Sequence, residues 1–180
     1  MPDHFVSDEV RVFAASRRFS ATTRDRWLRS TPGDQRTLLA VAQRLRLGEN
    51  QFRDLLDWSE EIAVRDGCAI AAVWAREPVA SALARDLGRN ELIAAVKSAL
   101  RQLRFPLLAA AEARLAELTR QLKLPRGAHL HLPAHLEGDE IRIEIRGRNA
   151  AALREQVAAV QSALSRAELD EMFRTLEQAP

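Results

Sequence analysis

Within an otherwise helical sequence, the stretch from His129 to Arg146 places apolar residues at every second position on both sides of a turn. This alternation is the period of a β-strand, and it predicts a hairpin with strands at 128–132 and 140–146. Two strands alone are marginally stable in water, so helices must cover the apolar face and an outer edge needs a further partner. The apolar face consists of Leu130, Leu132, Ile141, Ile143 and Ile145.

The rest of the chain has apolar residues at helical spacing, in segments that single glycines bring to an end. The fold class expected is therefore mainly α with a small α+β C-terminal unit. A helical domain over residues 1–88 would be followed by a helix-hairpin-helix unit over 89–180. The sequence predicts helices at 7–17, 22–30, 34–46, 50–65, 69–75, 78–87, 90–104, 106–123, 149–165 and 168–178.

Composition indicates a folded protein outside the membrane. Hydrophobic residues make up 47% of the chain and charged residues 29%, which is typical of a globular domain. No apolar run of about 18 residues could span a bilayer, and no secretory signal is visible at the start. The single cysteine, Cys68, excludes an internal disulfide framework and is read as a core residue. We expect a cytoplasmic protein.

The C-terminal unit is the candidate dimerisation domain. Its helix at 106–123 carries a narrow apolar seam, and the helix at 149–165 carries a second stripe, so both could cover the hairpin. A second copy could pair with the remaining strand edge about a two-fold axis. The expected interface is the apolar hairpin face together with Leu115 and Leu118 of the seam. The alternative is a monomer whose N-terminal helices cover the same surfaces.

A segment at 37–66 has the apolar spacing of a helix-turn-helix. A small residue, Ala42, precedes the turn, and Phe52 follows it on the inner face of the second helix. Arg46 stands where such motifs usually carry glycine. If the second helix enters a DNA groove, the side chains that could read base edges are Asn50, Gln51 and Arg53.

Charge in this second helix favours the alternative of simple helix packing. Between Glu49 and Asp66 there are six acidic residues and two arginines, a net charge of −4 that should repel phosphate. Basic residues instead outnumber acids nine to four between Arg85 and Arg126. Three of these cations form a row on one helix: Lys97, Arg101 and Arg104. This row could contact successive DNA phosphates, or it could be an ordinary solvated helix face.

Catalytic and cofactor motifs are not evident, so we expect neither an enzyme nor a bound cofactor. His129 and His131 share one strand face and form an outside candidate for a metal pair, with Glu140 or Glu144 across the hairpin. Strand alternation alone also explains polar side chains on an outer face, and no other metal ligands are expected.

The order of elements, with the stretch from Ala42 to Leu56, resembles that of the ParB-like partition proteins over roughly residues 37–165. The resemblance implies a non-catalytic DNA-associated homodimer, partition-like or regulatory. It does not extend to the family's N-terminal nucleotide-binding domain, since Arg17 and Arg18 are only a dipeptide. The alternative is a protein-protein interaction or adaptor protein with no role at nucleic acid.

Overall fold

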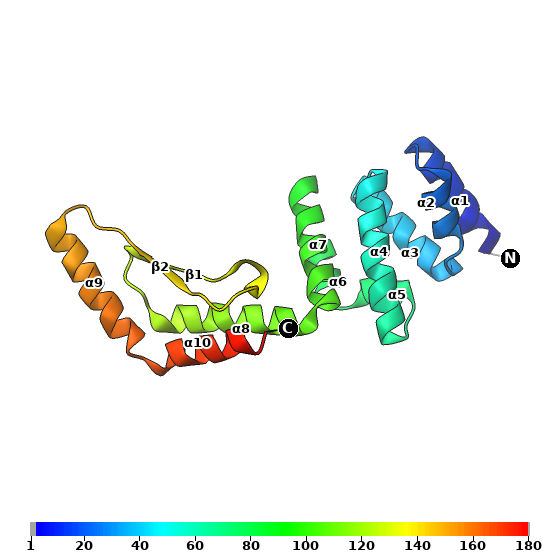
Figure 1. Cartoon of the computed structure of the whole chain (residues 1–180). Helices are drawn as coiled ribbons and strands as arrows, with labels where there is room; N and C mark the ends of the chain where they lie inside the picture. The colour runs from blue at the N-terminus through cyan, green and yellow to red at the C-terminus, as the bar shows by residue number, and fades with distance from the viewer. Residues whose placement is uncertain (1–2, 180) are drawn as a thin grey trace. The chain divides into compact units, whose positions relative to one another are not determined.

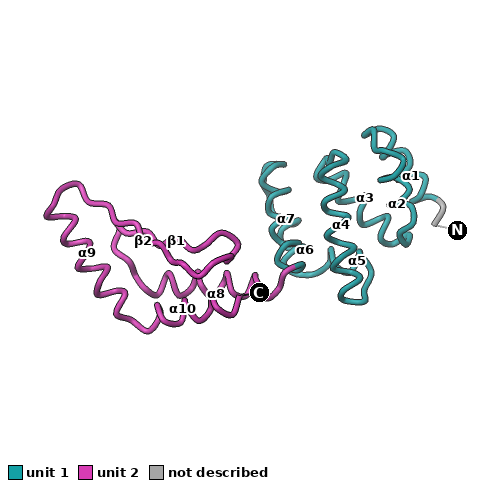
Figure 2. Tube along the Cα trace, viewed as in Figure 1, with its two compact units in different colours: residues 1–104 teal, residues 105–180 magenta. Residues whose placement is uncertain are grey.

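A computed structural model describes residues 3–179, which divide into two compact units after Arg104 (Figure 2). The boundary was expected near Gly88, where a domain of residues 1–88 would end. It lies further along because the helix that follows Gly88 packs on the helices of the N-terminal unit. The mainly helical fold with one small antiparallel sheet near the C-terminus is confirmed.

The N-terminal unit contains seven helices in its described residues (Figure 1). Each expected helix is present, and its ends differ from the predicted ones by a few residues. They are α1 (Asp3–Ser16), α2 (Ala21–Leu28), α3 (Pro32–Arg44), α4 (Glu49–Asp66), α5 (Ile70–Ala75), α6 (Val79–Ala84) and α7 (Arg89–Arg104).

One continuous apolar core holds these helices together. Its centre is aromatic: the rings of Trp27 on α2 and Phe52 on α4 lie 4.4 Å apart, and both side chains are fully buried. Phe13 and Phe19 extend this cluster toward α1. Large buried rings contribute more than any other side chain to a core, so Phe52 fixes α4 against the first two helices.

The C-terminal unit contains α8 (Pro106–Leu122), β1 (Ala128–His131), a 3-10 turn (Ala134–Leu136), β2 (Arg142–Ile145), α9 (Ala150–Leu164) and α10 (Ala167–Glu177). The strands pair antiparallel, with Leu130 opposite Ile143 and His131 opposite Arg142. The hairpin prediction is confirmed. The strands are shorter than expected because the chain leaves the ladder at each side of the 3-10 turn.

The core of this unit differs from the expected one. Leu115 and Leu118, assigned above to the dimer interface, are fully buried within the unit. They pack with Met172 and Leu176 because α10 lies along α8. The helix that completes this core is therefore α10, whereas the predicted helix at 149–165 contacts β2 and buries Val160 and Ala163 outside this core. Leu130, Leu132 and Ile141 of the hairpin region pack on the same core.

Helix α9 instead approaches the open end of the hairpin. A Cβ atom added to Gly147 would lie 2.8 Å from the backbone of Leu153, and one added to Gly127 would lie 2.9 Å from the side-chain oxygen of Gln156. Only glycine fits the close approach at Gly147, so this position limits where the start of α9 can lie, whereas at Gly127 the flexible Gln156 side chain could move away. Asn149 caps the helix through its side chain, as expected.

Because the core of the C-terminal unit is small, a single large-to-small substitution in it should lower the stability of the unit. We expect Leu118→Ala to destabilise it by about 2–5 kcal/mol, whereas Leu107→Ala on the same helix, at an exposed position, should change little. Urea unfolding followed by far-ultraviolet circular dichroism checks this. All three tryptophans belong to the N-terminal unit, so the transition of their fluorescence should stay in place. Equal dichroism midpoints for the two variants would contradict the assigned core.

Candidate functional site

The turn between α3 and α4 shares one backbone feature with helix-turn-helix motifs. Arg46, at the position where glycine is usual, has a φ of 48°, in the left-handed region. A residue with a side chain pays about 1–2 kcal/mol for this conformation, which explains the usual glycine. Ala42, Leu45 and Phe52 are buried around the turn, as the motif predicts.

Arg89 of α7 stabilises this turn. Its guanidinium donates hydrogen bonds to the backbone oxygens of Leu45 at 3.0 Å and Arg46 at 3.1 Å. It also donates to the side-chain oxygen of Gln51 at 3.1 Å. Sequence reasoning missed this role because the contact joins segments more than forty positions apart, and no local pattern signals it.

Two of the three predicted base-reading side chains are accessible. Asn50 and Arg53 lie exposed in the first turns of α4. Gln51 is half-buried and accepts the hydrogen bond from Arg89, so its side chain helps to hold the turn in place. The motif therefore presents one amide and one guanidinium at the N-terminal end of its second helix.

The predicted row of cations on α7 lies against α4. Lys97 forms an ion pair with Asp54 at 2.8 Å, and Arg104 forms one with Glu61 at 2.5 Å. Both cations also lie over the ring of Trp58, at 5.6 and 5.8 Å from its centre. At these distances a cation is attracted by the face of the indole. Arg101 follows Lys97 by one helical turn.

The other acids of α4 are also paired. Arg26 of α2 contacts Asp57 and Glu60 on a second side of the helix. At its ends, Glu49 accepts hydrogen bonds from the hydroxyls of Ser20 and Thr23, and Asp66 pairs with Arg65 and Arg76. All six carboxylates of the acidic helix thus have partners within the N-terminal unit.

These contacts change the expected nucleic-acid surface. Lys97 and Arg104 would have to leave carboxylates and an indole face before they could contact phosphate, so they are poor candidates for a phosphate-tracking row. The negative charge that seemed to forbid a DNA role for α4 is at the same time largely compensated. Of the side chains predicted to read bases, Asn50 and Arg53 are the exposed ones.

Two carboxyl groups of α4 have lowered pKa values. The hydroxyl of Ser20, and next that of Thr23, donates to Glu49 and holds its pKa below the ordinary value. The guanidinium of Arg65, and next that of Arg76, holds the pKa of Asp66 far below its ordinary value. Hydrogen bonds and charges that favour the ionised form explain both directions.

The histidine pair lies on the hairpin as expected. His129 is opposite Glu144 in the ladder, and His131 Nε2 lies 3.4 Å from a Glu144 oxygen. Arg146 also donates to Glu144, at 2.7 Å, and is the main cause of the lowered pKa of that carboxyl group. Within residues 3–179 no group of three or more histidine, cysteine or acidic side chains is placed to hold a metal ion.

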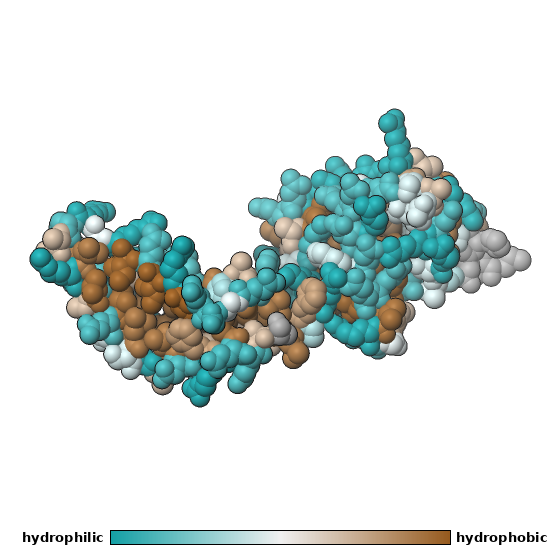
Figure 3. Space-filling model, viewed as in Figure 1, coloured by the Kyte–Doolittle hydropathy of each residue, from teal (hydrophilic) through white to brown (hydrophobic). Residues whose placement is uncertain are grey.

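An apolar surface lies on the C-terminal unit, where α9 contacts β2. Leu153 and Val157 of α9 are 41% and 46% exposed, and Ile143 and Ile145 of β2 are only half-buried. Figure 3 shows apolar side chains gathered over this part of the unit. Of the expected dimer residues, those on β2 border this surface, whereas Leu115 and Leu118 do not reach it.

The chain matches no protein-family model, no curated protein and no solved structure. The likeness to ParB-like partition proteins therefore stays a prediction. Among the described residues, no helix is both long enough and apolar enough to cross a membrane.

The lowered pKa of Glu49 predicts a pH-dependent contribution to stability. A carboxyl group whose pKa is lower in the folded state stabilises the fold above its unfolded pKa, and this contribution disappears as the pH falls through the folded pKa. Glu49→Gln should therefore unfold at lower urea than wild type at pH 7, and the gap should close as the pH drops below 4.5, the ordinary value. Tryptophan fluorescence in a series of buffers measures this.

Glu9→Gln is the matched control, because Glu9 is exposed on α1. Its unfolding midpoint should follow that of wild type at each pH. A gap between Glu49→Gln and wild type that is the same at pH 3 and pH 7 would show that the ionised carboxylate is not what stabilises the fold.

Proposed function

We propose that this chain is a binding protein that self-associates through its C-terminal unit and engages a macromolecular partner with its N-terminal helical unit. The observation that carries the first half is the exposed stripe of α9. Leu153 and Val157 lie one turn apart and half-exposed beside a sheet of only two strands. Apolar stripes and unpaired strand edges together are typical of surfaces that another subunit covers.

A second copy of the chain fits this surface. Each strand pairs on one side only, so an outer edge has backbone donors and acceptors available to an identical edge. Pairing about a two-fold axis would give a four-stranded sheet and would bury the stripes of both α9 helices at once. The interface would consist of β2 and α9, with the seam of α8 left in the core of each subunit.

For the partner of the N-terminal unit we propose DNA, bound at the start of α4. The left-handed turn at Arg46, supported by Arg89, is the observation that favours it. Such a turn places the first residues of the second helix where they could reach a major groove. Asn50 can recognise adenine, and Arg53 can recognise guanine or a phosphate. The alternative is a protein partner at the same helices.

Self-association predicts a specific effect of Val157→Asp. Wild type should have twice the mass of the 20.2 kDa chain, and the variant should be a monomer because an unpaired carboxylate is costly in an apolar interface. Sedimentation velocity measures both. Val64→Asp is the control, since it adds the same charge at an exposed valine of the N-terminal unit and should leave the mass unchanged.

Two outcomes would contradict the proposed dimer. One is a wild-type chain that sediments as a monomer at every concentration. The other is a dimer that both aspartate variants leave intact, because the stripe of α9 would then lie outside the interface.

DNA binding predicts a loss on Arg53→Ala. Affinity for a mixed-sequence duplex, measured by fluorescence anisotropy at low salt, should fall by about 1–3 kcal/mol if Arg53 contacts a base or phosphate. Binding should also weaken steeply as salt rises, since phosphate contacts release counterions. Arg174→Ala, an exposed arginine of α10 outside the proposed dimer interface, removes the same charge from the other unit and should bind almost as wild type.

Absence of binding by wild type at low salt would end the DNA proposal without affecting self-association. Equal losses in Arg53→Ala and Arg174→Ala would indicate general charge attraction, and would count against the start of α4 as the contact.

A further inference from the structure

Helix α1 has two apolar sides, and the core uses only one of them. Val6, Val10 and Ala14 follow at four-residue spacing and are buried. Phe5 and Val12, on another side of the helix, are 77% and 70% exposed. They are seven residues apart, or two helical turns, so they lie roughly in line along the helix. An apolar side of this kind has no role in the fold of the unit.

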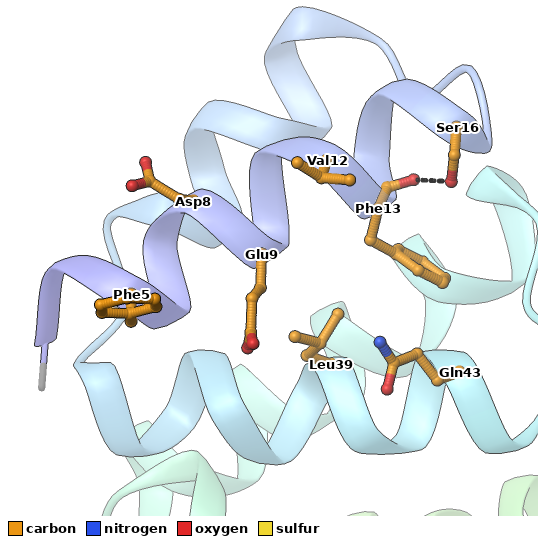
Figure 4. A pocket seen from close by; sticks show the side chains of 8 residues that line it. All are labelled: Phe5, Asp8, Glu9, Val12, Phe13, Ser16, Leu39 and Gln43. Carbon is orange, nitrogen blue, oxygen red and sulfur yellow. Dashed lines mark hydrogen bonds between the residues drawn. The ribbon is translucent and has the colours of Figure 1, made fainter.

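This second side borders a groove between α1 and α3, of about 590 Å³. Phe13 from α1 and Leu39 from α3 lie between the two helices, and Phe5 lies further along α1 (Figure 4). Ser16 and Gln43 line the end of the groove near the C-terminus of α1. The space is open and mostly apolar, and its lining on α1 runs from Phe5 to Ser16, about three helical turns.

Among the described residues that line the groove, the charged side chains are two carboxylates, Asp8 and Glu9, and none is a cation. Asp8 pairs with Arg11 at 2.8 Å. The Glu9 carboxylate points from α1 toward α3 (Figure 4), and no ion pair engages it within the described part of the chain. A negative charge beside apolar walls favours a ligand that is apolar on one face and positive at its flank.

We propose that this groove binds the apolar face of an amphipathic helix from a partner protein, a helix with lysine or arginine beside its apolar residues. Phe5 and Val12 would contact residues two turns apart on that helix, which is the spacing of helix-in-groove recognition. A lysine or arginine between these contacts would pair with Glu9. This site lies on α1 and α3, apart from α9, so it does not depend on the proposed dimer interface.

Two synthetic peptides test the proposal. Both form amphipathic helices with the same leucine stripe; one has lysine at the flanking positions and the other has glutamate. Each is labelled and titrated with the full chain in fluorescence anisotropy. We expect the lysine peptide to bind and the glutamate peptide to bind much more weakly, because its charge has the sign of the groove.

Variants of the full chain locate the binding. Val12→Asp should weaken binding of the lysine peptide about tenfold or more. Phe5→Ser should weaken it similarly, since each substitution removes an apolar side chain that contacts the peptide. Glu9→Gln should weaken it less and should reduce its dependence on salt. Val64→Asp, at an exposed valine of α4, should bind as wild type. Tryptophan fluorescence confirms that each variant is folded.

Three results would overturn the proposal: equal binding of both peptides, binding that neither Val12→Asp nor Phe5→Ser weakens, or no binding of the lysine peptide. Sedimentation velocity tests whether a second copy of the chain, and not a partner helix, occupies the groove. If Val12→Asp converts a wild-type dimer into a monomer, the groove is covered by a second copy of the chain, and the partner helix is ruled out.

Discussion

The pairing of α4 with the helices on either side of it determines how the N-terminal unit is built. A helix with a net charge of −4 would repel itself if its carboxylates stood alone, and here each has a partner. A partly exposed ion pair such as that of Lys97 with Asp54 contributes only about 0.2–1 kcal/mol, less than the burial of the Trp27 and Phe52 rings. The apolar core therefore supplies stability, and the charges select which faces of α2, α4 and α7 meet.

This division explains two features that looked opposed in the sequence. The acidic helix argued against DNA, and the basic helix argued for it. They are complementary surfaces of one packing contact, in which Lys97 and Arg104 lie over Trp58 and pair with acids of α4. The same contact moves the boundary between the units beyond Gly88, because α7 cannot leave α4 without exposing these charges and the apolar residues beneath them.

What the sequence predicted correctly depends on near neighbours along the chain. Spacings of two to four residues are enough to predict the helical periodicity, the helix caps and the strand alternation. They also predict that the Phe52 side chain faces the core. The contacts that it could not supply join distant segments: Arg26 with α4, Arg89 with the turn, and α10 with the seam of α8. Two amphipathic helices followed the hairpin, and periodicity alone could not decide which one would cover Leu115 and Leu118.

The position of α10 has a consequence for α9. Because α10 occupies the seam of α8, α9 packs instead near β2, with a close approach to Gly147 that engages its N-terminal half. Leu153 and Val157 are then left outside the core of the unit, next to a strand with one unpaired side. A two-stranded sheet gains stability from further strands, and an apolar stripe gains it from burial. One symmetric contact with a second copy would do both at once, and this is the physical reason for proposing self-association through β2 and α9.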